Sequence, residues 1–297
     1  MENKSEKGFH LAGVIPVSKF ETDFETVSHP SLLIIGKNFL ALERSIAECA
    51  FAGCETIWLC VDDDIEPLVR KRIGDYVLDP VWVNRSFAKK DKRFYSKDEQ
   101  KIIPIYYVPF ETAERQRLDS YGWGIVTAAR MAMHVCSRLS RWLAPDMFYA
   151  SFPSGLYSFS FLRAHRREIS SKTNFSVFST GKSFAQDAPL GFTFSPADLK
   201  EVIRDVRRKT SKSYEVTEKG EYNLLPKSEQ WSAKKFTIGE IFELIKDKEQ
   251  NKVEIEEYSE IRTWEDYRSF LGEKNKLTCP ERIFTRKTLP KIEGQSA

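Results

Sequence analysis

The sequence predicts an α/β fold in three layers, αβα, around a mostly parallel central sheet. Short, almost wholly apolar segments, as expected for strands covered on both faces, alternate with longer segments whose apolar residues recur at helical spacing. The chain has 297 residues and 41% hydrophobic content, enough to build a large core. We therefore predict one domain over residues 1–272, with a polar excursion at 210–235 and a polar tail at 273–297.

A βαβ unit opens the chain. Residues 9–17 (FHLAGVIPV) predict a buried strand, and residues 38–53 predict a helix that Gly53 ends. Residues 56–61 (TIWLCV) predict a second buried strand, which runs into Asp62, Asp63 and Asp64.

The alternation then continues along the chain. We expect helices at 65–77, 122–143, 160–169, 195–209 and 237–248, and strands at 101–109, 147–152, 174–180, 190–194 and 252–258. Ser195 as N-cap and Pro196 at the first helical position mark one helix start clearly. The excursion at 210–235 reads as a long loop with room for a hairpin. In such sheets ligands bind at the carboxyl ends of the strands.

Composition excludes several classes of protein. Forty-six basic and 43 acidic residues give a net charge of +3, which does not favour non-specific nucleic-acid binding. No apolar segment is long enough for a membrane helix, and the N-terminus lacks the pattern of a signal peptide, so a cytoplasmic protein is expected. The five cysteines lack the paired spacing of a zinc site, and we expect four of them, all but Cys279, to be buried thiols.

Five segments, in order, resemble the sugar-nucleotide nucleotidylyltransferases of the GT-A fold, in the nucleotide-diphospho-sugar transferase superfamily. HPSLLIIGKNFLALERSI (29–46) is similar to PKxLLPIGGKPLLEHVI, and AGCETIWLCV (52–61) to AGVTEIVVVV. YGWGIVTAARMA (121–132) resembles GTAGALLAA, and YASFP (149–153) takes the place of GDxP. EIRTWEDY (260–267) is similar to DIGTPEDY or DIDTPEDL. The resemblance covers roughly residues 9–270.

The resemblance implies a reaction in which a sugar phosphate attacks the α-phosphate of a nucleoside triphosphate and expels pyrophosphate. Positioning and electrostatic stabilisation by Mg²⁺ and cations would carry the catalysis. It implies nucleotide binding by Pro16, Val17, Ser18, Lys19 and Gly122, with Lys19 also catalytic.

The resemblance also implies a magnesium site, because Mg²⁺ prefers hard oxygen ligands such as carboxylates. Glu260 would be one metal ligand, and Ser151 stands where the second ligand, an aspartate, is expected. Magnesium is therefore the cofactor expected of an active enzyme.

The sequence departs from the family pattern at the phosphate-binding loop as well. Residues 17–30 contain no glycine and carry Glu21, Asp23 and Glu25 where a triphosphate would lie, and Ser31 replaces an expected lysine. The departures favour a catalytically inactive GT-A-like domain that serves as a binding or structural subunit.

Three functions therefore stay open. The leading interpretation, which follows the resemblance, is a divergent nucleotidylyltransferase that takes a nucleoside triphosphate and a sugar phosphate. The inactive domain is the first alternative and would have a ligand or a protein partner. A sugar-nucleotide-dependent glycosyltransferase would need an acidic metal motif, for which Asp62 to Asp64 are the candidates. No membrane or nucleic-acid partner is expected.

Other patterns predict no site. STGKS (179–183) lacks the first glycine of a phosphate-binding loop and the helix after it. The four histidines have no metal-ligand spacing, and His134, in an apolar helix, is expected to be packed rather than catalytic.

Overall fold

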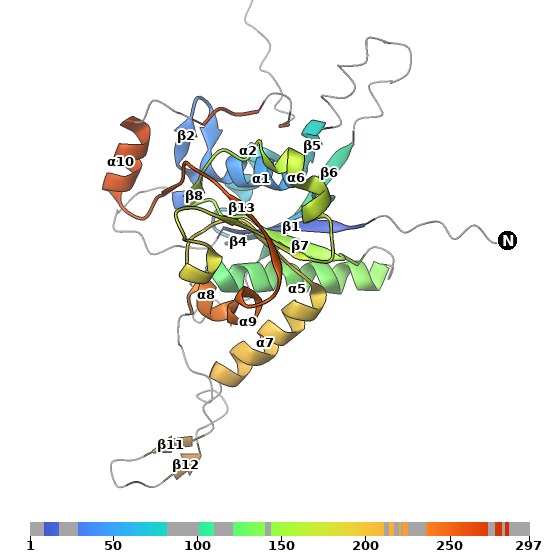
Figure 1. Cartoon of the computed structure of the whole chain (residues 1–297), viewed down its shortest axis with the longest axis vertical. Helices are drawn as coiled ribbons and strands as arrows, with labels where there is room; N and C mark the ends of the chain where they lie inside the picture. The colour runs from blue at the N-terminus through green and yellow to red at the C-terminus, as the bar shows by residue number, and fades with distance from the viewer. Residues whose placement is uncertain are drawn as a thin grey trace, which may run out of the picture.

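The structure is a computed structural model that describes residues 9–17, 29–81, 101–109, 121–139, 144–210, 214–216, 220, 222–224, 236–272, 277–280 and 283–284. An eight-stranded sheet forms its middle layer (Figure 1). In spatial order the strands are β13 (Gln250–Glu254), β9 (Asn174–Phe178), β10 (Phe192–Phe194), β7 (Met147–Ala150), β1 (Leu11–Val17), β4 (Thr56–Val61), β6 (Ile102–Pro109) and β5 (Tyr76–Leu78).

The sheet is mostly parallel, which confirms the predicted fold class. Strand β1 pairs in parallel with β4 and β7, β4 pairs in parallel with β6, and β13 with β9. Strand β10 runs antiparallel to β7 and β9, and β5 runs antiparallel to β6. The carboxyl ends of β1, β4 and β7 therefore meet at one edge of the sheet.

Helices cover both faces of the sheet (Figure 1). One face carries α1 (Ala41–Ala52), α2 (Glu66–Ile73) and α6 (Leu162–Ile169), and the other carries α5 (Tyr121–Leu139), α7 (Pro196–Thr210), α8 (Ile238–Ile241) and α9 (Glu243–Lys246). Alternate residues of β1 serve the two cores, since Ile15 and Val17 pack on the α1 side and Val14 packs on the α5 side.

Smaller elements complete the described fold. They are the 3₁₀ turns η1 (Pro30–Leu32) and η4 (Phe184–Gln186), the strands β2 (Ile34–Gly36), β3 (Phe39–Leu40), β8 (Gly155–Leu156), β11 (Tyr214–Val216), β12 (Tyr222–Leu224) and β14 (Ser259–Glu260), and the helix α10 (Trp264–Gly272). Strands β11 and β12 pair with each other, so the polar excursion contains the expected hairpin.

The structure corrects three expected elements. The helix at 65–77 ends at Ile73 because Gly74 has a φ of 89°, and the chain turns there into the edge strand β5. The helix at 237–248 breaks at Phe242 into α8 and α9. The strand at 252–258 starts earlier, at Gln250, and stops at Glu254.

Burial bears out one prediction about side chains and overturns another. Four cysteines, Cys49, Cys54, Cys60 and Cys136, are buried as predicted. The prediction for His134 was wrong, because this side chain lies on the exposed face of α5. None of the described helices is both long enough and apolar enough to cross a membrane.

The tail also contributes to the core. Ile283 is fully buried on the α1 side and its carbonyl accepts a hydrogen bond from the Leu78 N–H at 3.0 Å. Leu277 packs against the same core. Part of the polar tail is thus folded onto the domain.

Candidate functional site

The predicted nucleotide-binding residues lie partly at the carboxyl end of β1. Pro16 and Val17 end this strand, both buried, opposite Cys60 and Val61 of β4. Ser18 and Lys19 fall outside the described residues. The nucleotide-binding and catalytic roles of these four residues therefore stay predictions.

Gly122 has a packing role in the structure. It lies in the first turn of α5 against α8, where a Cβ atom at this position would be 2.6 Å from Cδ1 of Ile241. The helices can approach this closely because the glycine has no side chain. Its nucleotide-binding role likewise stays a prediction.

Ser151 lies at the carboxyl end of β7, beside β1, where the resemblance places a metal-binding aspartate. Its N–H donates to the Val14 carbonyl of β1 at 3.1 Å. Its side chain is fully buried, and the hydroxyl donates to Oε2 of Glu48 at 2.5 Å. Ser151 therefore faces the protein interior and α1.

A buried polar cluster, which we call the Glu48 cluster, surrounds this hydroxyl. Its members are Arg44, Glu48, Tyr149, Ser151 and Tyr157, all buried. The Glu48 carboxylate accepts from Nη2 of Arg44 at 2.6 Å, from the Tyr149 hydroxyl at 2.7 Å and from the Tyr157 hydroxyl. Nη1 of Arg44 donates to the Phe152 carbonyl at 3.0 Å. The buried charges are thus paired and hydrogen-bonded.

The protonation of the cluster follows from its burial. Desolvation alone would lower the pKa of Arg44, but Glu48 and Tyr157 outweigh that effect, and the pKa of the guanidinium is raised. Burial, reinforced by Glu48, raises the pKa of the Tyr149 and Tyr157 phenols, so both stay protonated donors. This cluster was not predicted from the sequence. Its one local signal is the i,i+4 spacing of Arg44 and Glu48.

Glu260 lies in β14, where the resemblance expects an acidic residue. Its Oε1 accepts from Nε of Arg262, and its Oε2 accepts from the Tyr258 hydroxyl at 3.3 Å. Burial raises the pKa of Tyr258, and the neighbouring carboxylate raises it further. The Glu260 carboxylate is thus already paired with a guanidinium.

The β8–β14 ladder brings the Glu260 segment beside residues 154–156, which follow Ser151 in the chain. Glu260 pairs with Gly155 across the ladder, and the N–H of Ile261 donates to the Ser154 carbonyl at 3.1 Å. Tyr121, at the start of α5, is close to Glu260 and Arg262, which shift its pKa in opposite directions after burial has raised it. The late Glu260 segment therefore returns to the chain that follows β7, as the resemblance implies.

These residues do not form the donor set that Mg²⁺ requires. Magnesium binds carboxylates and other hard oxygens in a near-octahedral arrangement. Here one expected ligand is a hydroxyl that donates into the core, and the other is a carboxylate paired with Arg262. Among the described residues no three histidine, cysteine, aspartate or glutamate side chains are grouped to hold a metal ion.

The acidic residues considered for a glycosyltransferase metal motif lie elsewhere on the same edge of the sheet. Asp62, Asp63 and Asp64 follow the carboxyl end of β4, and the Asp62 carbonyl accepts from the N–H groups of Ile65 and Glu66 at the start of α2. This segment is a turn into a helix.

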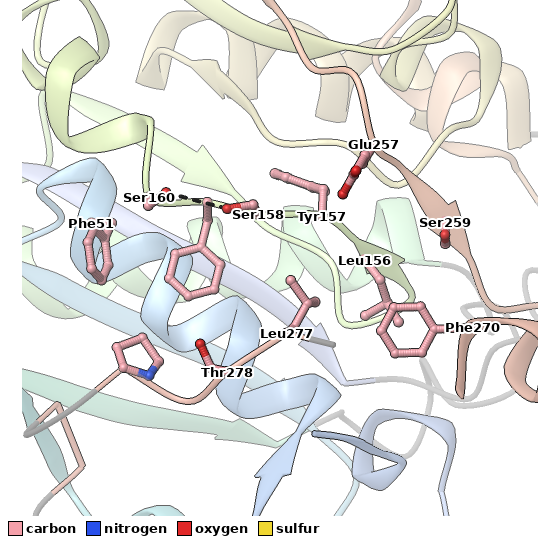
Figure 2. Close-up of a pocket in the computed structure, with 12 residues that line it drawn as sticks. Phe51, Leu156, Tyr157, Ser158, Ser160, Glu257, Ser259, Phe270, Leu277 and Thr278 are labelled. Atoms are coloured by element: carbon pink, nitrogen blue, oxygen red, sulfur yellow. Dashed lines mark hydrogen bonds between the residues drawn. The ribbon is translucent and has the colours of Figure 1, made fainter. Parts of the chain in front are cut away.

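A pocket lies behind the β8–β14 ladder, as Figure 2 shows. Its volume is about 450 Å³. Its walls are Phe51 of α1, residues 156–160, Glu257, Ser259, Phe270 of α10, and Leu277, Thr278 and Pro280 of the tail. Successive strand residues point to opposite faces, so Ser259 lines the pocket while Glu260 points to the other side of the ladder.

The pocket lining combines aromatic rings with hydroxyl groups. The rings of Phe51 and Phe159 meet edge to face at a centroid distance of 5.2 Å. Ser158, Ser160 and Thr278 add exposed hydroxyls. Tyr157 belongs to both the pocket and the Glu48 cluster.

Comparison with known proteins identifies the fold. No model of a known protein family matches the chain, and no curated protein matches it. A UDP-glucose pyrophosphorylase complexed with UDP-glucose has a similar structure, with a TM-score of 0.53 and 11% identity over 89% of this chain and 98% of that chain. A Bacillus anthracis protein assigned as a glucose-1-phosphate thymidylyltransferase, in complex with sucrose, gives a TM-score of 0.52 and 8% identity over 90% and 97%.

A third solved structure agrees with these two. A UTP-bound UGPase from Acinetobacter baumannii gives a TM-score of 0.50 and 10% identity over 89% of this chain and 92% of that chain. All three align along nearly their whole length. The chain therefore has the fold of the sugar-nucleotide nucleotidylyltransferases.

Proposed function

We propose that this chain is a nucleotide-binding domain that does not transfer the nucleotidyl group. Its ligand would be a nucleotide or a nucleotide sugar, bound at the sheet edge formed by β1, β7 and the start of α5. The fold supports this ligand class, since the similar structures include a protein bound to UTP and one bound to UDP-glucose. Fold alone does not carry a reaction.

The hydrogen bond from Ser151 to Glu48 carries the proposal. Nucleotidylyl transfer spreads negative charge over phosphate oxygens, and a carboxylate-bound magnesium ion would stabilise that charge. At the position of the expected aspartate, this chain has Ser151, whose neutral hydroxyl donates to Oε2 of Glu48 at 2.5 Å. A fully buried hydroxyl engaged in this way offers no charge to a metal ion at the edge.

The experiment measures pyrophosphate release and binding side by side. The purified chain is incubated with each of the four nucleoside triphosphates, a panel of sugar 1-phosphates and Mg²⁺, while calorimetry measures nucleotide binding. We expect the chain to bind at least one nucleotide. We expect it to release pyrophosphate no faster than the buffer alone does.

Two results would overturn the proposal. Pyrophosphate release that Glu260→Gln abolishes would establish a nucleotidylyltransferase. Release of nucleoside diphosphate from a nucleotide sugar, dependent on an acceptor and lost in Asp63→Asn, would establish a glycosyltransferase. Ser137→Ala, on an exposed part of α5, serves as the control for purification and handling.

The pocket behind the β8–β14 ladder favours a second binding function, for a small hydroxylated molecule. Aromatic faces and convergent hydroxyls suit a sugar ring, which has an apolar face and polar edges. Glucose and UDP-glucose are the probes for ligand-observed NMR. Ser160→Trp should fill the pocket and abolish the signal, whereas Ser137→Trp should not change it. A signal that survives Ser160→Trp would place the ligand elsewhere.

A further inference from the structure

Arg262 stands at a position where the resembled family has glycine or aspartate. The segment EIRT (260–263) matches DIGT or DIDT, so the first acid is kept as Glu260 and a cation takes the place of a neutral or acidic residue. The Arg262 side chain is 51% exposed and that of Glu260 is 22% exposed. The guanidinium is therefore the more accessible of the two charges at this corner.

The corner holds Arg262 in place. Its side chain donates to the Glu260 carboxylate and, at 3.4 Å, to the Asp187 carbonyl. Its backbone N–H donates to the Asp266 carboxylate at 3.1 Å, and the same carboxylate accepts from the Thr263 N–H at 2.8 Å. An arginine fixed in this way loses little side-chain entropy when it binds a ligand.

Arg262 makes this corner a poorer site for a divalent cation than carboxylates alone would be. A cation bound by Glu260 would lie next to a permanent positive charge and would compete with it for the same carboxylate. A phosphate, in contrast, can accept two parallel hydrogen bonds from a guanidinium. The electrostatic effect of both groups reaches Tyr121 at the start of α5, where burial raises the pKa of the phenol, Glu260 raises it further and Arg262 lowers it.

We infer that Arg262 supplies at this edge the positive charge that magnesium supplies in the expected site, so that nucleotide phosphates bind without a metal ion. This inference rests on the proposed nucleotide binding and specifies how the phosphates are held. It makes Arg262 a ligand-binding residue and makes Glu260 a carboxylate that competes with the phosphates for the guanidinium.

Calorimetry with UTP and UDP, each in EDTA and in excess Mg²⁺, tests the inference by the sign of the magnesium effect. Magnesium ions neutralise free phosphates, so we expect affinity to be several-fold higher in EDTA. In EDTA, Arg262→Gln should weaken binding about tenfold or more, because it removes a charge-assisted contact. Arg262→Lys should retain part of the affinity.

Two further variants separate the two roles of this corner. Glu260→Gln should strengthen binding in EDTA, because it releases Arg262 from its partner carboxylate. Arg268→Gln removes an exposed charge from α10, the helix that follows this corner, and serves as the matched control, with affinity unchanged within twofold. Thermal unfolding of each variant shows whether the domain stays folded.

Changes in nucleotide affinity opposite to those expected would overturn the inference. Stronger binding in Mg²⁺, together with weaker binding by Glu260→Gln, would establish a metal site. Equal affinity of Arg262→Gln and the unchanged chain would also overturn it.

The failure of the inference can be told apart from the failure of the proposed function. Pyrophosphate release with metal-independent binding would overturn only the proposed function. Absence of binding by every nucleoside triphosphate and by UDP in both conditions would overturn both.

Discussion

Glu48 is the residue on which the interior beneath the candidate edge depends. Its carboxylate is the counter-ion of Arg44, and neither side chain is exposed to solvent. Glu48→Gln would leave a buried guanidinium without its counter-charge. We expect this variant to lose about 3–5 kcal/mol of unfolding free energy, measured by urea denaturation.

A surface pair provides the control for this prediction. Glu55 pairs with Lys101 at 3.5 Å, and both side chains are more than 40% exposed. Glu55→Gln should therefore cost less than about 1 kcal/mol. Equal losses from the two variants would show that burial of the Glu48 pair is unimportant.

Gly122 allows a second test at the scale of one residue. Gly122→Ala would place a methyl group 2.6 Å from Cδ1 of Ile241, so α5 and α8 must separate or the isoleucine must move. We expect a loss of about 1–3 kcal/mol in urea denaturation. Combining it with Ile241→Val should recover part of the loss. Gly272→Ala, which has open space around the added methyl, should be near neutral, and a comparable loss there would contradict this account.

Single residues were predictable where order along the chain defines position. Ser151 and Glu260 were expected at strand ends, and both are found there. The Glu48 cluster was not predictable, because an Arg–Glu pair at i,i+4 on a helix is usually a solvated surface pair. The tyrosines that make it a core feature lie 101 and 109 residues further along the chain.

At the scale of elements, the start of α7 links two parts of the domain through Asp198. Its carboxylate accepts from the Ser195 N–H at 2.7 Å and pairs with Nζ of Lys248 at 2.5 Å. Burial would raise the pKa of Asp198, but the bonds from Lys248 and Ser195 outweigh it, and its pKa lies below the ordinary value of 3.8.

This shift predicts how stability depends on pH. Because the folded state holds the lower pKa, the stabilisation is present above pH 3.8 and is lost as pH falls through the folded value. Asp198→Asn should lose about 1 kcal/mol of unfolding free energy at pH 6. In acid the unchanged chain loses the same stabilisation, so the unfolding free energies of the two proteins should converge as pH falls. Exposed Asp247→Asn is the control. A gap that stays constant between pH 6 and 3 would contradict the prediction.

Elements were predictable in kind and order, but less so in their ends and directions. The run at 190–194 indicated a strand, yet nothing local distinguishes the antiparallel β10 from its parallel neighbours. The helix after β4 was predicted too long because its apolar pattern continues into β5. Only the backbone conformation of Gly74 separates the helix from the strand. Apolar periodicity reports burial, whereas direction is set by pairing with distant chain.

At the scale of the whole molecule, the tail closes the α1 side of the core. Ile283 is fully buried there, although the segment around it is polar. Ile283→Ala should cost about 2–4 kcal/mol in urea denaturation, as expected for a buried truncation. Ile34→Ala is the control, because Ile34 is 59% exposed. A neutral Ile283→Ala would mean that this contact adds nothing to the domain.

The overall architecture was the most predictable property of the chain. Alternating strands and helices imply a parallel sheet with both faces covered, whatever the details of the loops. The placement of Ile283 could not be predicted, since the pair Ile283 and Phe284 in a polar segment gives no periodic signal.

The β8–β14 ladder implies an order of events during synthesis. Ser154 and Gly155 leave the ribosome well before their partners Glu260 and Ile261. Domains generally fold as units, so this ladder cannot close until both of its strands have been synthesised. The position of Arg262 is therefore set only after β1, β4 and β7 have all been made.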